Sequence, residues 1–143
     1  MELRENALTV DTYLGIRAAV NWKKLERAQA EKALHNSLYT VVVYDGENAV
    51  GMGRIVGDGA VICYIQDLAV HPDYHGKGIG SLVIEKLIDY VKSIRMPGTT
   101  IMLDLMCAKG RETFYQKHQF IARPTADLGP GMIQYIADTL ETK

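Results

Sequence analysis

The sequence predicts an α/β fold, with a sheet of mixed strand direction and helices on both faces. Residues 39–70 contain three β-branched and apolar runs separated by turn residues, which is typical of an antiparallel meander. One long amphipathic stretch begins at residue 79, and shorter strand-like and helix-like stretches alternate after it. The 143 residues contain no internal repeat, low-complexity tract or linker-like stretch. We therefore expect one domain that covers residues 1–143.

The chain before residue 39 is expected to form one short strand and two helices. Residues 2–6 suit a short edge strand. Thr9 is a favourable N-cap residue, and apolar residues follow it at helical spacing as far as Trp22. Residues 26–35 are rich in Ala, Glu, Lys and Leu, which predicts a second helix.

Turn residues divide the meander. Its strands are expected at residues 39–44, 48–56 and 61–70. Asp45-Gly46 is a strong hairpin signal between the first two strands. Gly51 and Gly53 lie inside the second strand, where glycine indicates a bulge or a close approach to the backbone.

Helix and strand patterns alternate in the second half of the chain. The amphipathic helix that begins at residue 79 is expected to end before Pro97-Gly98. Thereafter we expect a strand at 99–105, a helix at 111–117 and strands at 120–122 and 132–137.

Composition excludes several classes of protein. The apolar fraction of 48% and the charged fraction of 23% are ordinary for a globular protein, and the formal net charge is -1. No sequence-wide basic field would attract nucleic acid or an anionic membrane surface, so we expect neither partner. Cys63 and Cys107 form neither a disulfide framework nor a metal-ligand spacing, so no metal site is expected. No apolar run approaches the ~20 residues of a membrane span, and we expect a cytoplasmic protein.

A glycine-rich turn, Gly76–Gly80, follows the third strand of the meander and opens the long helix. Free backbone N–H groups and the positive end of the helix dipole meet at such a turn, which makes it an anion site. The nucleotide triphosphate loop requires Ser or Thr after Gly-Lys, but here Gly78 follows Lys77. The dinucleotide fingerprint, Gly-x-Gly-x-x-Gly, also has a different glycine spacing. A third kind of phosphate loop is therefore indicated.

The segment from Asp67 to Gly80 resembles the coenzyme A loop of the GNAT acetyltransferase superfamily. The family pattern is a strand that ends in Val-x-Pro, then Gln/Arg-x-x-Gly-x-Gly/Ala, and then a helix. Gly78 and Gly80 match the two small positions, and His75 stands where Gln or Arg is usual.

Residues 112–120 resemble the closing signature of the same superfamily, which is aromatic/Leu-Tyr-x-Lys-x-Gly-Phe. The matching residues are Phe114, Tyr115, Lys117 and Phe120. Gln119 stands where glycine is usual, and Ala108 stands where asparagine is common. The two segments follow the order and spacing of the family, and the resemblance covers about residues 50–120.

The resemblance implies a GNAT-like fold with a mixed, mainly antiparallel sheet of six to seven strands. It implies acetyl-CoA as cosubstrate, and many members of the superfamily are homodimers. Main-chain groups of the third meander strand would pair with the pantetheine arm, at Leu68, Ala69 and Val70. The turn would bind the cofactor through His75, Gly76, Lys77, Gly78, Ile79, Gly80 and Ser81.

The chemistry of acetyl transfer requires a proton donor and a proton acceptor. A tyrosine hydroxyl, with a pKa near ~10, can protonate the departing thiolate, whose thiol has a pKa near ~8.5. We name Tyr115 as the general acid, by the resemblance and by this fit; the alternative is a helix-end tyrosine that packs on the sheet. Asp67 is the only carboxylate on the third strand, so we name it as the base of the acceptor amine. The alternatives for the base are Tyr64, Gln66 and His71.

The predicted function is transfer of an acetyl group from acetyl-CoA to a small primary amine by direct attack on the thioester. A non-catalytic acyl-CoA-binding regulatory module is one alternative, supported by His75, Ala108 and Gln119 and opposed by Tyr115. An acetyltransferase of protein N-termini or lysines is another. The acceptor and the acyl chain length are left open, because family acceptor sites are built from variable loops.

Overall fold

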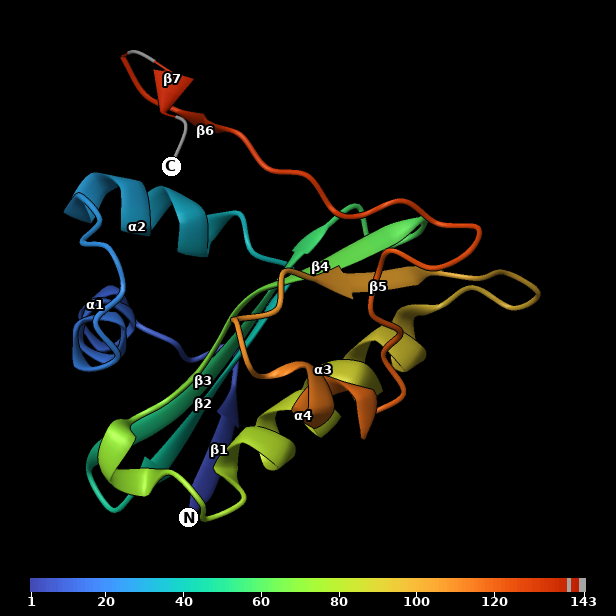
Figure 1. The fold of residues 1–143 in the computed structure, drawn as a ribbon. Coiled ribbons are helices and arrows are strands. Elements are labelled where there is room, and N and C mark those ends of the chain that lie inside the picture. Colours follow the sequence, from blue (N-terminus) through green and yellow to red (C-terminus); the bar gives the residue numbers. More distant parts are fainter. Residues whose placement is uncertain (139, 142–143) are drawn as a thin grey trace. The chain divides into compact units, whose positions relative to one another are not determined.

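The structure is a computed structural model that describes residues 1–138 and 140–141. It comprises two compact units, Met1–Leu105 and a second that begins at Met106. Each is described by itself, and the single domain over residues 1–143 stays a prediction. Within the described residues, the chain has no helix long and apolar enough to span a membrane. The elements of the first unit are β1 (Glu2–Glu5), α1 (Val10–Ala19), α2 (Arg27–His35), β2 (Tyr39–Asp45), β3 (Asn48–Gly57), β4 (Ile62–Val70), a 3-10 turn (Pro72–Tyr74), α3 (Ile79–Ile94) and β5 (Met102–Leu105) (Figure 1).

One sheet contains β1 to β5 in sequential order. The pairs β1–β2, β2–β3 and β3–β4 are antiparallel, whereas β4 and β5 are parallel. Helix α3 connects the two parallel strands, because such strands require a long crossover. The mixed, mainly antiparallel sheet is confirmed, although it has five strands instead of the expected six to seven.

Tight turns shape the antiparallel part of the sheet. Gly46 has a φ of 62° in the β2–β3 hairpin, a conformation that favours glycine. In the β3–β4 turn, Oδ1 of Asp58 accepts hydrogen bonds from the backbone N–H groups of Ile62, Ala60 and Val61 at 3.0, 2.9 and 2.8 Å. These bonds favour the carboxylate and lower the pKa of Asp58 below its ordinary value of 3.8.

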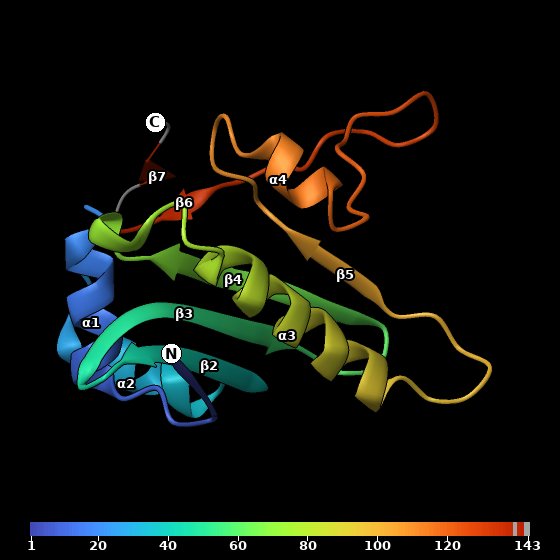
Figure 2. The ribbon, with the colours of Figure 1, turned by 90° about the horizontal axis from the view of Figure 1, so that it is seen from below.

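Alternate residues of β3 meet different helices, as the two-residue period of a strand requires. Met52 belongs to a core cluster with Tyr13 of α1 and Ala30 of α2. Gly51 and Gly53 instead meet α3. Figures 1 and 2 show α1 and α2 on one face of the sheet and α3 on the other. The expected arrangement of helices on both faces is confirmed.

Helix α3 lies very close to β3. A Cβ atom on Gly51 would stand 2.7 Å from Cγ2 of Ile79, and one on Gly53 would stand 2.7 Å from Cγ1 of Val83. Protein side chains do not pack at such distances, so these positions require glycine unless the helix moves. The close approach predicted from the two glycines is confirmed. Ile79 is the first residue of α3, so its contact with Gly51 fixes the start of the helix.

Helix α1 begins as predicted and ends earlier. Thr9 is the N-cap, and its Oγ1 accepts a hydrogen bond from the N–H of Thr12 at 3.2 Å. The predicted continuation to Trp22 is wrong, because the helix ends at Ala19. Asn21 has a φ of 60°, in the left-handed region, and a right-handed helix cannot continue through it.

The second unit contains one short helix and a small sheet. Its elements are α4 (Glu112–Gln116), β6 (Tyr135–Ile136) and β7 (Leu140–Glu141), and the two strands pair antiparallel. Residues 120–122, which the structure describes, form no strand, so that prediction is wrong. The strand predicted at 132–137 is shortened to β6.

Local bonds explain why the chain between α4 and β6 is not a longer strand. The carbonyl oxygen of Leu128 accepts a hydrogen bond from the N–H of Thr125 at 2.8 Å. The carbonyl oxygen of Gly129 accepts one from Nε of Arg123 at 2.6 Å. Pro130 has no backbone N–H to donate. Polar groups that a strand would use for pairing are therefore engaged locally or missing.

Candidate active site

The turn between β4 and α3 combines left-handed glycines with the start of a long helix. Gly76 and Gly78 have φ values of 77° and 80°, in the left-handed region that favours glycine. Gly78 is the N-cap residue of α3 and has no side chain to cap the helix. The N–H groups of a first helical turn lack acceptors within the helix and lie at the positive end of its dipole. This geometry is that of an anion-binding turn.

Two side chains anchor the turn to its surroundings. Nε2 of His75 donates a hydrogen bond to the carbonyl of Val70, the last residue of β4, at 2.9 Å. The ammonium of Lys77 is 4.9 Å from the centre of the Tyr74 ring, and the Tyr74 hydroxyl donates to Asp45 at 2.8 Å. The turn is therefore fixed both to the end of β4 and to the β2–β3 hairpin.

Strands β4 and β5 separate on the way to this turn. Their pairing ends at Ile65 and Leu105, where β5 stops. Strand β4 continues to Val70 and remains paired with β3. In the described part of the first unit, residues 66–70 of β4 have a strand neighbour on one edge only. Leu68, Ala69 and Val70 lie in this stretch, beyond the last residue of β4 that pairs with β5.

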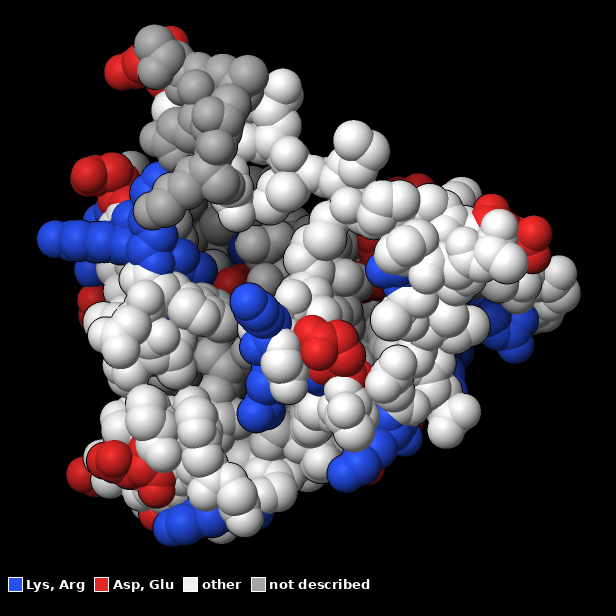
Figure 3. All heavy atoms as spheres, viewed as in Figure 1, with Lys and Arg blue, Asp and Glu red and all other residues white. Residues whose placement is uncertain are grey.

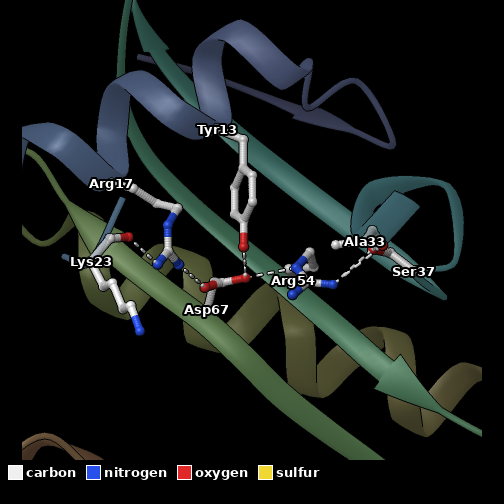
Figure 4. A network of polar contacts seen from close by, with 7 residues as sticks. All are labelled: Tyr13, Arg17, Lys23, Ala33, Ser37, Arg54 and Asp67. Atoms are coloured by element: carbon white, nitrogen blue, oxygen red, sulfur yellow. Dashed lines mark hydrogen bonds and ion pairs between the residues drawn. The ribbon is translucent and has the colours of Figure 1, made fainter. Parts of the chain in front are cut away.

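Asp67 lies at the centre of a buried polar network (Figure 4). Its side chain is 1% exposed. Oδ2 accepts hydrogen bonds from the Tyr13 hydroxyl at 2.8 Å and from Nε of Arg54 at 2.6 Å. Oδ1 accepts a longer one, at 3.4 Å, from Nη1 of Arg17. A second nitrogen of Arg54, Nη1, donates to Oγ of Ser37 at 3.2 Å.

This network favours a positioning role for Asp67 over the predicted role as base. Both carboxylate oxygens already accept hydrogen bonds, and the buried side chain offers an amine no direct contact. Burial raises the pKa of Tyr13, and the neighbouring Asp67 carboxylate raises it further. The Tyr13 hydroxyl therefore stays protonated at neutral pH and remains a donor to Asp67.

The other base candidates differ in their surroundings. Gln66 is exposed and has no ionisable group, and Tyr64 is half-buried. Nδ1 of His71 accepts a hydrogen bond from the N–H of Asp73 at 3.1 Å, so one ring nitrogen is engaged by the 3-10 turn.

A cleft of about 530 Å³ lies on the first unit beside the β2–β3 hairpin. It is lined by Thr12, Tyr44, Glu47, Asn48, Ala49, Val50, His71, Asp73 and Tyr74. The two carboxylates in this lining, Glu47 and Asp73, give the cleft an acidic character. Its size suits a small ligand.

Tyr115, the predicted general acid, lies in α4 of the second unit. Its ring packs edge to face against the rings of Phe114 and Phe120, with centroids 5.1 and 5.8 Å away. Burial raises the pKa of Tyr115, the neighbouring Cys107 raises it further, and Arg111 opposes both. The hydroxyl therefore keeps its proton at neutral pH, as a general acid must.

The backbone at Gln119 explains the glycine that is usual at this position in the family. Gln119 has a φ of 72°, which glycine adopts without strain and other residues adopt at a cost. The N–H of the next residue, Phe120, still reaches the carbonyl of Tyr115 at 3.2 Å. Glutamine thus preserves the turn that follows α4, although its left-handed backbone conformation is less favourable for glutamine than for glycine.

Sequence reasoning missed the partners of Asp67. The available signal was Arg54, a charged residue inside the apolar run of β3. A buried charge requires an opposite charge or good hydrogen bonds, and Asp67 is the carboxylate of the next strand. Tyr13 and Arg17 lie four residues apart on α1, one helical turn, and both reach Asp67.

Comparison with known proteins agrees with this geometry. A family model described as an acetyltransferase (GNAT) domain matches residues 36–122. A solved structure of a "Probable Acetyltransferase" from meticillin-resistant Staphylococcus aureus is 32% identical, with a TM-score of 0.82 over 95% of this chain and 98% of that chain. Two uncharacterised N-acetyltransferases, ycf52 of Pyropia yezoensis and ycf52-like of Prochlorococcus marinus, are 29% and 31% identical over 82% and 74% of this chain.

The matches cover different shares of this chain and of its relatives. The chain spans 66% and 59% of the lengths of the two curated relatives. The family match covers more than half of the chain and includes both the β4–α3 turn and α4. The chain belongs to the GNAT acetyltransferase family.

Proposed function

We propose that the protein transfers an acetyl group from acetyl-CoA to the nitrogen of a small primary amine. The observation that carries this proposal is the left-handed glycine turn at Gly76 and Gly78, which begins α3. The turn follows the end of β4, where β4 no longer pairs with β5. An anion site next to an unpaired main-chain edge suits a ligand that is phosphorylated at one end and amide-rich along its arm. Coenzyme A has this chemistry.

The donor would bind mainly through the backbone. Its pyrophosphate would accept hydrogen bonds from the N–H groups of residues 76–81 at the start of α3. Its pantetheine amides would pair with the main chain of Leu68, Ala69 and Val70. Lys77 would add a positive charge beside the turn, and His75 would hold the end of β4 in place through Val70. The acyl end would then lie near the point where β4 and β5 separate.

The transfer itself needs one nucleophile and one proton donor. The neutral amine attacks the thioester carbonyl carbon with its lone pair and forms a C–N bond. The C–S bond then breaks, the sulfur leaves with the electron pair, and the Tyr115 hydroxyl gives it a proton. The proton lost from nitrogen passes to solvent, which reprotonates the tyrosine. General-acid help of this kind contributes roughly 10²–10⁴ in rate.

Asp67 has a different part in this proposal. Its carboxylate holds Tyr13, Arg17 and Arg54 beside the reacting region, and it does not touch the amine.

We also propose that the enzyme is a cytoplasmic homodimer. The alternative of a non-catalytic regulatory module now rests on Ala108. The other two substituted positions keep their local structure, because His75 bonds to the carbonyl of Val70 and the turn at Gln119 still closes on the carbonyl of Tyr115.

Thiol release from acetyl-CoA across a broad panel of primary amines tests the proposal. We expect at least one amine to be acetylated by the wild type. Tyr115→Phe should reduce its kcat at least about tenfold, because the proton donor is lost, while the affinity for coenzyme A stays unchanged. Coenzyme A binding without turnover of any amine would favour the regulatory module. Turnover of peptides alone would favour a protein acetyltransferase.

A further inference from the structure

Arg17 is the least neutralised charge of the buried network. The network has two guanidinium groups, Arg17 and Arg54, and one carboxylate, Asp67, so two positive charges face one negative charge. Asp67 lies 2.6 Å from Arg54 but 3.4 Å from Arg17. The Arg17 side chain is only 12% exposed. Among the described residues its one ion pair is this longer one, so it has lost most of its hydration for a weak counter-charge, which is an unfavourable state for a charge.

The hydrogen-bond donors of Arg17 are also incompletely used. Nη2 donates to the carbonyl of Lys23 at 2.8 Å, and Nη1 makes the long contact with Asp67. Nε has no partner among the described residues. The rings of Tyr13 and Trp22 flank the guanidinium, with centroids 5.6 and 5.3 Å from its carbon. A guanidinium has five N–H groups, and these two contacts use only two of them, so further N–H donors remain on Nη1 and Nη2 beside the buried Nε.

The connection between α1 and α2 surrounds Arg17 with further positive charge. Lys23 and Lys24 are exposed and outnumber the one acidic residue of this connection, Glu26, which lies at its far end. Figure 3 shows Lys and Arg side chains over this connection, at the left of the view. Trp22 is 37% exposed and adds an aromatic surface. An anion that approaches Arg17 is therefore attracted by its immediate surroundings.

The network also lies where the proposed acyl group would react. Asp67 follows the point on β4 at which the pairing with β5 ends, and it precedes the proposed pantetheine edge at Leu68. With the phosphates at the β4–α3 turn, the pantetheine arm would run back along β4 and bring the thioester toward Asp67. Arg17 contacts Asp67 from α1. One small molecule can therefore reach both the thioester and Arg17.

We propose that the acceptor carries a carboxylate in addition to its primary amine, as an amino acid does, and that Arg17 binds this carboxylate. This inference rests on the proposed function and names its substrate class. A carboxylate and a guanidinium form two parallel charge-assisted hydrogen bonds. Binding would balance the excess positive charge of the network, and Trp22 would contact the rest of the acceptor.

The test uses amino acids, each paired with the amine that lacks only its carboxylate, such as phenylalanine and phenethylamine. For the best substrate, we expect kcat/KM to be at least about tenfold higher for the member with the carboxylate, as for a charge-assisted hydrogen bond. Arg17→Lys keeps a positive charge beside Asp67 but loses the two-pronged geometry, so it should reduce this ratio at least about fivefold. A merely structural role of Arg17 would lower both rates equally and leave the ratio unchanged.

Arg27→Lys is the matched control, because Arg27 is an exposed arginine of α2 that pairs with Asp11. Arg27→Lys should change the ratio of the two kcat/KM values, with and without the carboxylate, by no more than about twofold, as expected for a surface charge. The melting temperature of each variant shows that the fold is intact. A ratio that is near one in the wild type, or that Arg17→Lys does not change, overturns the inference. The acidic cleft lined by Glu47 and Asp73 would then be the better acceptor site.

Direct binding separates this inference from the proposed function. Calorimetric titration with the same pairs, without acetyl-CoA, requires no turnover. If an amino acid binds in an Arg17-dependent manner and no amine is acetylated, the proposed function fails and the carboxylate site stands. If amines are acetylated with no preference for a carboxylate, the proposed function stands and this inference fails.

Discussion

The carboxylate of Asp67 on β4 lies 2.6 Å from Nε of Arg54, the residue directly opposite it on β3. Their side chains are 1% and 8% exposed, so the two charges face each other inside the protein. The strand register thus supplies the charge and its counter-charge on the same face of the sheet. Removal of one partner would leave the other as an unpaired buried ion.

Asp67→Asn should destabilise the fold strongly. Asparagine fills the same volume but leaves Arg54 and Arg17 without a counter-charge, so the free energy of unfolding should fall by roughly 3 kcal/mol or more. Urea unfolding followed by circular dichroism measures the change. Tyr13→Phe is the milder control, because it removes one hydrogen bond to Asp67 and should cost about 1 kcal/mol. Equal effects of both variants would contradict a dominant role of the carboxylate charge.

Gly51→Ala should destabilise the packing of α3. The new methyl group would stand 2.7 Å from Cγ2 of Ile79, so the helix must shift. Overpacking of this kind costs about 1–3 kcal/mol. Gly15→Ala, inside α1 with nothing within 4 Å of the added Cβ, should instead stabilise by about 0.5–1 kcal/mol because alanine favours a helix. Thermal unfolding of both variants checks the opposite signs.

Gly78→Ala should weaken coenzyme A binding at least about tenfold, which corresponds to the loss of one good hydrogen bond. Alanine is strained at a φ of 80°, and relief of the strain would turn the N–H groups of the turn away from the phosphates. Gly98→Ala is the matched control, because Gly98 has a φ of 77° and equally open surroundings. Both variants should lose about 1 kcal/mol of stability. Calorimetric titration should find weaker coenzyme A binding in Gly78→Ala alone.

The stability contributed by Asp58 should depend on pH in the acid range. Its pKa in the folded protein lies below the ordinary value of 3.8, which applies to the unfolded chain. The contribution is therefore fully present above pH 3.8 and is lost as the pH falls through the folded pKa. The difference in unfolding free energy between the wild type and Asp58→Asn should be constant from pH 6 to pH 8 and shrink below about pH 4. A difference that grows on acidification would contradict the assignment.

Local patterns predicted those parts of the fold that depend on neighbouring residues. Thr9 as N-cap, the turn at Gly46 and the meander of β2 to β4 follow from short-range chemistry. The glycines of β3 also predicted a close contact correctly, because the space beside Gly51 and Gly53 is filled by side chains of α3. The left-handed turn before α3 could be predicted for the same reason, because Gly76 and Gly78 adopt its conformation without strain.

Long-range pairing could not be predicted in the same way. The strand pattern singles out Asp67 as the one carboxylate of its strand but gives it no partner, whereas the fold brings Arg54, Tyr13 and Arg17 to it from three other positions in the chain. Before β6, Arg123 and Thr125 donate to the carbonyls of Gly129 and Leu128, so this stretch is held by local bonds and not by strand pairing. Such contacts depend on the tertiary arrangement and leave no periodic trace in the sequence.

The hydrogen bond from Tyr74 to Asp45 connects the segment between β4 and α3 to the β2–β3 hairpin. A ligand that immobilises the turn will therefore slow the opening of the β2–β3 hairpin as well. Amide hydrogen exchange at residues 45–48 then reports occupancy of a site that lies some thirty residues further along the chain. The hairpin thus offers a reporter for ligand binding at a turn with which it shares a single side-chain hydrogen bond.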